Sequence, residues 1–469
     1  MSRMLHSWAA MRLAVLGAIA IHLGCSSGSP VSGGGGEIPD AASCKRPRGA
    51  WSAMSAVGAP KMSATATAVF TGSEVLVVDV ATYEGATYDV CHDTWSPLGA
   101  SPPSPPPMPG SVISGSPASA QIGSRVVFWL DHKSVALDLV ARRWSIPVGT
   151  APLSGHGRYT VVGGLLLTER DPDYSDVPSY LYDVQADTWI PTPATGIEER
   201  AASVFVAAGD RLVYWGGSRP VSGDLQKLIF PDAMMFGDGV VFNPANRTWA
   251  AMAMEGAPSP RARPVVAATA HEVFVWGGFG KVRWGGAPAE PWRDGAIYDV
   301  DTNRWRSVST VGAPDARAQP VSLLTGGGLV VWGGNRIAAD GSDGGRANDG
   351  AVYDLKQNTW APIGPAPSAL PGGSGYAAYP TTGGDVAFFA GETLGALLHL
   401  SERRWETLDL AGGPVGRSQP LRAWTGRHLV VWGGATLRTM GCENVPPGVG
   451  CDPIAIRDFL NGGFVYAVE

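Results

Sequence analysis

Charged residues are scarce in this sequence. Asp, Glu, Lys and Arg make up 16% of its 469 residues, and the formal net charge at pH 7 is −6. No basic cluster indicates a nucleic-acid partner, and no acidic tail indicates a basic one. Beyond the N-terminal segment, no stretch keeps a helical period. The scarcity therefore argues against a nucleic-acid-binding protein, and the missing period argues against a helical fold.

Cysteine is also scarce, and no two cysteines have the CxxC spacing of zinc or thioredoxin-like sites. If Cys25 is set aside as a processing site, four cysteines remain, and an even number in an exported protein favours disulfides. Three pairings are possible. We prefer Cys442–Cys451, which closes a short Pro/Gly loop, together with Cys44–Cys91, over the alternative of free buried thiols.

The N-terminus has the features of a targeting segment. Arg3 and Arg12 precede a mostly apolar run, Leu13–Leu23, which is too short to span a bilayer comfortably but suits a signal peptide. The run ends at Cys25, and this arrangement resembles a bacterial lipoprotein signal in which the cysteine is lipidated. Cleavage after Ala20 is the alternative. We therefore predict a signal peptide over 1–24, lipidation of Cys25 and export, with the bacterial outer membrane favoured over a periplasmic or secreted location.

A Gly/Ser/Pro-rich stretch follows the signal and is expected to form a flexible tether over 25–50. From residue 51 onward the chain repeats, with phrases such as "ATYDVCHDTW", "AIYDVDTNRW" and "AVYDLKQNTW". The tryptophans that end these phrases lie 44 to 60 residues apart, at Trp51, Trp95, Trp144, Trp189, Trp249, Trp305, Trp360 and Trp405. A period of this size indicates a β-propeller.

Each repeat indicates four short strands, because β-branched and aromatic runs alternate with Gly, Pro and Asp. Six residues before most of the tryptophans lies a short polar residue, and we interpret it as turn-forming because Asp and Asn accept hydrogen bonds from nearby backbone N–H groups. The last repeat has a third strand but no tryptophan strand, and the missing strand begins at Trp51. Pairing of the two ends would close an eight-bladed ring over 51–469, with seven blades as the alternative.

These phrases resemble the kelch-repeat propellers of the galactose oxidase superfamily. The resemblance rests on the diglycines, the following Tyr-Asp and the spaced tryptophans, and it covers essentially Trp51 to Glu469. It implies an all-β kelch-type propeller. It also implies that loops joining second and third strands share a face with the connections between blades, and that this face often holds the ligand. Kelch propellers include both enzymes and binding modules, so the fold alone does not decide the function.

Four of the second-to-third-strand loops are long, namely Ser218 to Asp238, Phe279 to Asp294, Asn335 to Asp349 and Ala435 to Asn461. Long loops grouped on a scaffold are where function is usually found. Trp284, Trp292, Phe230 and Phe236 lie in or near them, and they either stack on a sugar ring or pack the loops themselves.

Two charged columns accompany these loops. An arginine precedes the first strand at Arg200, Arg261, Arg317 and Arg417, and an acid followed by Gly precedes the third strand at Glu84, Asp238, Asp294 and Asp349. The arginines could form a ring that binds an anionic ligand by bidentate contacts. Alternatively, the two columns neutralise each other between strands. Both interpretations predict arginines and acids on the ligand face.

Copper chemistry of the galactose oxidase type would require two Tyr and two His at one metal, and this chain has no Tyr-His pair. The resemblance places His92, His271 and His428 on the face opposite the long loops, and only His156 near the channel mouth. We therefore predict no cofactor and no metal site. The favoured function is an anchored, monomeric binding module for a protein, peptide or glycan, and the alternative is a carbohydrate-active lyase or epimerase using the same face.

Overall fold

The computed structural model describes residues 44, 46–99, 117–130, 132–152, 159–168, 180–220, 233–281, 291–338, 343–367, 370, 376–440 and 454–469. All regular elements in these ranges are β-strands, apart from turns and bends. None of the described segments is a helix long and apolar enough to cross a membrane. The all-β architecture predicted from the repeats is thus confirmed.

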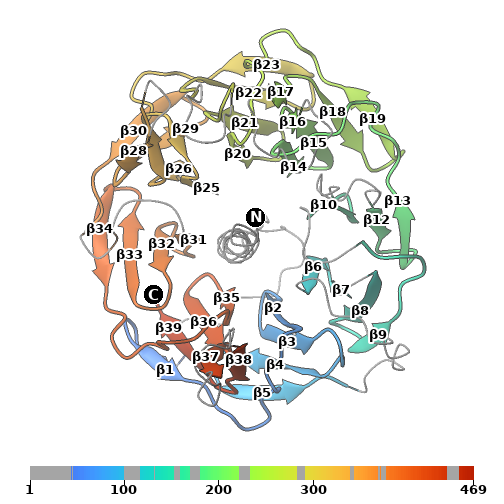
Figure 1. Ribbon diagram of the computed structural model, residues 1–469, viewed down its shortest axis with the longest axis vertical. Helices are drawn as coiled ribbons and strands as arrows, with labels where there is room; N and C mark the ends of the chain where they lie inside the picture. The colour runs from blue at the N-terminus through green and yellow to red at the C-terminus, as the bar shows by residue number, and fades with distance from the viewer. Residues whose placement is uncertain are drawn as a thin grey trace, which may run out of the picture.

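The described residues form eight four-stranded antiparallel sheets, which we call blades 1 to 8 and which Figure 1 shows arranged in a ring. Blades 1 to 3 follow the chain: β2 (Ala66–Phe70), β3 (Val75–Asp79), β4 (Gly85–Asp89), β5 (Thr94–Pro97); β6 (Ala118–Ile122), β7 (Arg125–Leu130), β8 (Lys133–Asp138), β9 (Arg143–Ser145); β10 (Tyr159–Val162), β11 (Leu165–Thr168), β12 (Tyr180–Asp183), β13 (Thr188–Pro191).

Blades 4 to 7 follow the same inner-to-outer order. They comprise β14 (Val204–Ala208), β15 (Arg211–Trp215), β18 (Gly239–Asn243), β19 (Thr248–Ala251); β20 (Val265–Ala268), β21 (Glu272–Trp276), β22 (Gly295–Asp299), β23 (Arg304–Ser307); β25 (Val321–Thr325), β26 (Gly328–Trp332), β29 (Gly350–Asp354), β30 (Thr359–Ile363); β31 (Ala377–Pro380), β32 (Val386–Ala390), β33 (Leu394–His399), β34 (Arg404–Leu408).

Blade 8 combines the two ends of the described chain. Its inner strands are β35 (Leu421–Trp424), β36 (His428–Trp432) and β39 (Gly463–Ala467), and its outer strand is β1 (Trp51–Ala53). β1 runs antiparallel to β39, with Trp51 opposite Tyr466 (Figure 1). The Trp51 indole N–H also donates to the Leu410 carbonyl, at 3.1 Å, and so ties β1 to the segment that follows blade 7.

A disulfide holds the segment before β1. Cys44 is bonded to Cys91 in the β4–β5 turn of blade 1, which is the pairing we preferred from the sequence. Beside it, Arg46 donates to the Val90 carbonyl and to Asp93, at 3.0 and 2.7 Å. The start of the propeller is therefore fixed to blade 1 as well as to blade 8.

In blades 1 to 6, the polar residue six positions before the tryptophan forms a turn, as predicted. In blade 5, Asp299 accepts hydrogen bonds from the backbone N–H groups of Asp301 and Thr302, at 3.0 and 2.9 Å. Asp89, Asp138, Asp183 and Asp354 accept the equivalent pair, and Asn243 accepts one bond of it. His399, at this position in blade 7, instead contacts Asp385 and Glu406.

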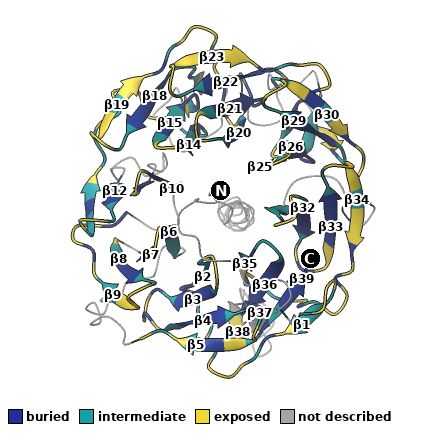
Figure 2. Ribbon diagram, turned by 180° about the vertical axis from the view of Figure 1, so that it is seen from behind, coloured by how far each residue is buried: buried dark blue, intermediate teal, exposed yellow. Residues whose placement is uncertain are grey.

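The core lies between neighbouring blades, where Figure 2 shows mostly buried second and third strands and more exposed outer strands. Trp305 of blade 5 packs on Trp215 of blade 4 with ring centroids 5.5 Å apart, and its N–H donates to the Ala253 carbonyl at 2.8 Å. Trp360 repeats this contact on Trp276. Since a buried aromatic contributes about 2 kcal/mol by area alone, these repeated pairs hold successive blades together.

Antiparallel strand order gives the ring two different faces. First-to-second and third-to-fourth strand turns lie on one side, which we call the turn face. Second-to-third strand connections and the segments between blades lie on the other, which we call the long-loop face. Its described parts include 216–220, 233–238, 277–281, 291–294, 333–338, 343–349, 433–440 and 454–462. Cys44 and Cys91 lie on the turn face, because Cys91 is in a third-to-fourth strand turn.

Candidate functional site

Three of the long loops are built as β-ribbons on the long-loop face. They contain β16 (Ser218–Pro220) with β17 (Ala233–Met235), β27 (Asn335–Ile337) with β28 (Asp343–Arg346), and β37 (Ala435–Met440) with β38 (Ile454–Phe459). β24 (Arg317–Ala318) adds a third strand beside β27. In blade 5, an isolated bridge between Phe279 and Pro291 joins the two sides of the loop. The loops therefore have defined bases.

One arginine lies at the base of each long loop, and we call Arg200, Arg261, Arg317 and Arg417 the loop-base arginines. Arg261 shows the pattern in blade 5. Its Nη1 donates to the carbonyls of Gly277 and Asp294, at 3.0 and 3.1 Å, which mark the two ends of the loop. Its Nη2 donates to the Asp294 carboxylate at 3.0 Å, and its Nε to the Ser259 carbonyl at 2.9 Å.

Blade 6 repeats this arrangement, and in blade 4 Arg200 bonds the carbonyl at one end of the loop, that of Asp238. Arg200 pairs with Asp238 at 2.6 Å, and Arg317 pairs with Asp349 at 3.1 Å. The arginine side chains of blades 4, 5 and 6 are 0%, 0% and 1% exposed, whereas their aspartates are 45%, 47% and 43% exposed. The three guanidinium groups therefore lie beneath the face, and their carboxylates lie at its surface.

Burial and pairing act on these groups in opposite directions. Burial lowers the pKa of Arg261 and of Arg317, while the neighbouring aspartates partly restore it. The hydrogen bond from Arg200 holds the pKa of Asp238 below its usual range. An arginine taken out of water needs such a partner, because an unpaired buried charge is costly. In blades 4 to 6, the aspartates of the acid column thus neutralise the charge of the buried loop-base arginines.

The diglycines permit this packing. In blade 5, the second glycine, Gly278, has a φ of +83°, and a Cβ there would lie 2.6 Å from the Ala262 carbonyl oxygen. Gly334 of blade 6 has the same constraint against the Ala318 carbonyl, at 2.5 Å.

A third column was not anticipated from the sequence. Two residues after each loop-base arginine the backbone takes a positive φ, of 56°, 52°, 50° and 50° at Ala202, Arg263, Gln319 and Gln419. Left-handed backbone is uncommon for residues other than glycine and clusters at functional sites. Arg263, Gln319 and Gln419 are exposed. The available signal was the proline that follows these three residues.

Blade 8 departs from the pattern. Arg417 donates from Nη1 to the Gly433 and Gly462 carbonyls, both at 2.7 Å, and so closes its loop in the usual way. The residue before the third strand is Gly462, where blades 4 to 6 have aspartate. Within the described part of the chain, Arg417 forms no ion pair. Glu84 of blade 1, the other member of the acid column, lies in a blade whose described residues include no loop-base arginine.

The aromatic candidates divide into packed and undescribed residues. Phe236 is buried, and the Arg200 Cζ lies 4.0 Å from its ring centroid. Trp292 is half-buried over Arg261, at 5.6 Å. Both therefore pack their own loops. His156, Trp284, Phe230, Cys25 and the predicted Cys442–Cys451 pair lie outside the described residues.

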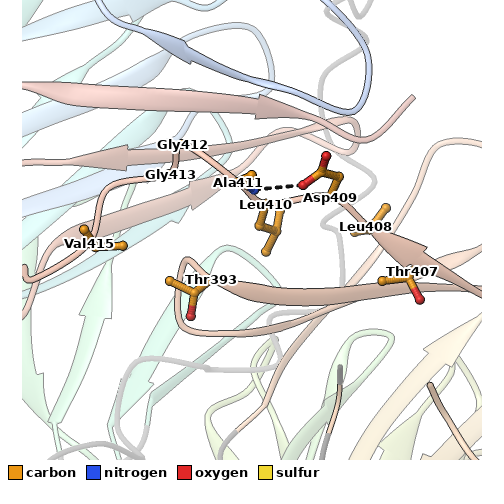
Figure 3. A pocket seen from close by; sticks show the side chains of 9 residues that line it. All are labelled: Thr393, Thr407, Leu408, Asp409, Leu410, Ala411, Gly412, Gly413 and Val415. Atoms are coloured by element: carbon orange, nitrogen blue, oxygen red, sulfur yellow. Dashed lines mark hydrogen bonds between the residues drawn. The ribbon is translucent and has the colours of Figure 1, made fainter. Parts of the chain in front are cut away.

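A shallow cavity of about 530 Å³ also opens on the long-loop face, between blades 7 and 8. Figure 3 shows Thr393, Thr407, the segment 408–413 and Val415 around it, with the Ala411 N–H donating to Asp409 at 3.0 Å. The blade 7 loop is short here, which leaves this space uncovered. No sequence candidate lines it.

The histidines of the turn face contact local acids or the disulfide. His271 pairs with Asp301 and His92 with Asp89, both at 2.8 Å, and both side chains are largely exposed. His428 is buried beside Cys44. Among the residues that the structure describes, no three His, Cys, Asp or Glu side chains gather as a metal site would require.

Comparison with known families agrees with the repeat pattern. The model for the KLHDC2/KLHL20/DRC7 Kelch-repeats domain matches residues 149–391 and 230–434, which together span more than half of the chain. This protein therefore belongs to the kelch-repeat propellers. No curated protein matches it significantly.

Proposed function

We propose that this protein is an exported binding module that presents a ligand surface on its long-loop face. The observation that supports the proposal is that the bases of the long loops are fixed by hydrogen bonds. In each of four blades, a partly or fully buried arginine bonds to its long loop. Loops fixed on a rigid scaffold are suited to recognition. Membership of the kelch-repeat propellers supports an interaction module of this kind.

The ligand of this surface is proposed to be a protein, peptide or glycan. The test is binding of the purified propeller to glycan and peptide arrays, repeated with Gln319→Ala and Gln419→Ala. Both side chains are exposed on the long-loop face, so we expect their removal to weaken binding without changing the melting temperature. The matched control is His271→Ala on the turn face, which should leave binding unchanged. Equal loss in all three variants, or no ligand on either array, would contradict the proposal.

We further propose that Cys25 carries a lipid anchor. The chain enters the propeller at Cys44, on the turn face. A lipid anchor at Cys25 would therefore lie on the side of the turn face, and the long-loop face would point away from the membrane. The anchored protein is expected to partition into detergent and Cys25→Ser to remain in the aqueous phase, since lipid chains supply about 0.8 kcal/mol per buried CH₂. Identical partitioning of the two forms would indicate ordinary secretion.

A further inference from the structure

Blade 8 contains the one loop-base arginine of the described chain that has no carboxylate partner. In blades 5 and 6, the equivalent arginines bond both loop carbonyls and pair with an aspartate, and in blade 4 Arg200 bonds the carbonyl and the carboxylate of Asp238. Arg417 keeps the two carbonyl bonds through Nη1, but its Nε and Nη2 donate to no described residue. These two nitrogens form the edge of guanidinium that binds a carboxylate with two parallel hydrogen bonds.

The place of the missing carboxylate is open. Gly462 occupies the position of Asp238, Asp294 and Asp349, immediately before the third strand. A Cβ added at Gly462 would meet no heavy atom of the described residues within 4 Å, and the φ of Gly462 is not positive. No side chain in the described part of blade 8 therefore replaces the aspartate, and a ligand atom could approach where the carboxylate lies in the other blades.

The surroundings favour a carboxylate there. Arg417 is partly buried, and this burial lowers the pKa of its guanidinium. The nearby acid, Glu392, is already engaged by Arg422, whose Nε lies 2.7 Å from it. The ring of Phe464 lies 5.3 Å from the Arg417 Cζ and covers one side of the cation. A desolvated cation without a counter-charge gains more from an anion than an exposed one does.

The loop that Arg417 closes also supplies apolar surface. On the β37–β38 ribbon, Leu437 lies opposite Arg457, and Ala435 lies opposite Phe459, so Leu437 and Phe459 belong to the same side of the ribbon. Leu437 is 59% exposed and Phe459 is 39% exposed. A ligand that joins a carboxylate to an apolar body would match both features.

We propose that Arg417 and the open position at Gly462 form a binding site for the carboxylate of a ligand. The site rests on the proposed function, because it would be the anchoring point of the long-loop face. Arg417 would donate from Nη2 to one carboxylate oxygen, as Arg261 does to Asp294, and from its free Nε to the other. Peptide carboxylates and uronic acids share this chemistry.

Gly462→Asp tests the site directly. The new aspartate would complete the pattern of blades 4 to 6, occupy the site from within and leave the melting temperature equal or higher. Gly462→Asn is the matched control, because it adds a side chain of the same shape without the charge. Arg417→Gln is a second variant that removes the cation while keeping a hydrogen-bond donor.

The probes are N-acetyl-leucine, its neutral amide and galacturonate, measured by ligand-observed NMR. We expect wild type and Gly462→Asn to bind at least one acid with a Kd in the millimolar range, and the amide about tenfold more weakly. Gly462→Asp and Arg417→Gln should each lose about tenfold for that acid. Preference for the leucine derivative would indicate a peptide source, and preference for galacturonate a glycan source.

The proposal is overturned if wild type binds neither acid, if it binds the amide equally well, or if folded Gly462→Asp binds like wild type. The array experiment separates this result from the proposed function. An array ligand that binds Gly462→Asp as well as wild type would support the long-loop face and reject the carboxylate site. Binding of the acid probes without any array ligand would do the reverse.

Discussion

Single arginines decide how the long loops are held. Arg261 has no exposed side-chain surface, whereas its partner Asp294 is half exposed, so the two members of the pair depend on each other unequally. Loss of Asp294 leaves a buried cation unpaired, while loss of Arg261 leaves a carboxylate that water can reach. The sequence predicted both columns and the possibility of pairing. It could not predict the inequality, which depends on depth beneath the face.

We predict that Asp294→Ala lowers the free energy of unfolding by about 3 kcal/mol, because it leaves the buried Arg261 guanidinium without a counter-charge. Arg261→Met should also destabilise, since two loop carbonyls and Asp294 lose their donor. The double variant should cost clearly less than the sum of the single changes, because the pair acts as a unit. Thermal and denaturant melts measure all three. Strictly additive losses would show that the two side chains act independently.

His428 gives the fold a defined response to acid. Burial, with smaller contributions from Arg46 and Arg427, lowers the pKa of His428 from 6.5 to about 4. Between these two values the unfolded chain binds a proton that the folded chain excludes, so stability falls as the pH drops from about 6.5 towards 4. The full contribution is about 3 kcal/mol. Below the lower pKa both states are protonated and the loss is complete.

Unfolding free energies of wild type and His428→Gln, measured from pH 7.5 to 4, test this response. The difference between the two proteins should shrink or reverse as the pH falls, because the variant lacks the titrating group. His271→Gln, which changes an exposed histidine on the same face, is the control and should follow wild type. Parallel curves for wild type and His428→Gln would contradict the assignment.

At the scale of the strand, β1 is short but occupies the outer edge of blade 8. It pairs with β39 over three residues, and Trp51 packs against Tyr466 with ring centroids 5.3 Å apart. Without β1, the outer edge of β39 would present unpaired backbone groups, which favours association between molecules.

Deletion of residues 1–55 should therefore lower the melting temperature and cause aggregation. The deletion also removes Cys44, so the matched control is Cys44→Ser combined with Cys91→Ser in a chain that keeps β1. We expect the control to be destabilised yet remain monomeric in light scattering. If the deleted protein is also monomeric and melts with the control, β1 contributes nothing beyond the disulfide.

Strands were the most predictable elements, and loop structure the least. Alternation of apolar residues and the fixed position of Trp305 or Trp360 in each repeat mark strands locally. The β37–β38 ribbon was predicted only as a long loop, because its pairing depends on contact with the loop base rather than on alternation. The left-handed residues Arg263 and Gln319 were missed because the only local signal was the proline that follows each of them.

At the scale of the molecule, the two faces have different chemistry. The turn face holds the disulfide, the turn-forming aspartates and the histidine contacts. The long-loop face holds the ribbons and the loop-base arginines. The resemblance to kelch repeats predicted that division, but it could not single out Arg417, because its difference from Arg261 lies in a glycine 45 residues away.

The pairing of β1 with β39 has a consequence for the order of folding. β1 is synthesised near the start of the chain, and its partner is separated from it by almost the whole propeller, so closure must wait until the last strand has emerged. The Cys44–Cys91 bond, with a separation of 47 residues, can form far earlier. Once formed, it keeps β1 beside blade 1, where blade 8 will later arrive. The late search is thereby reduced to the docking of the three inner strands of blade 8 onto a strand that is already in place.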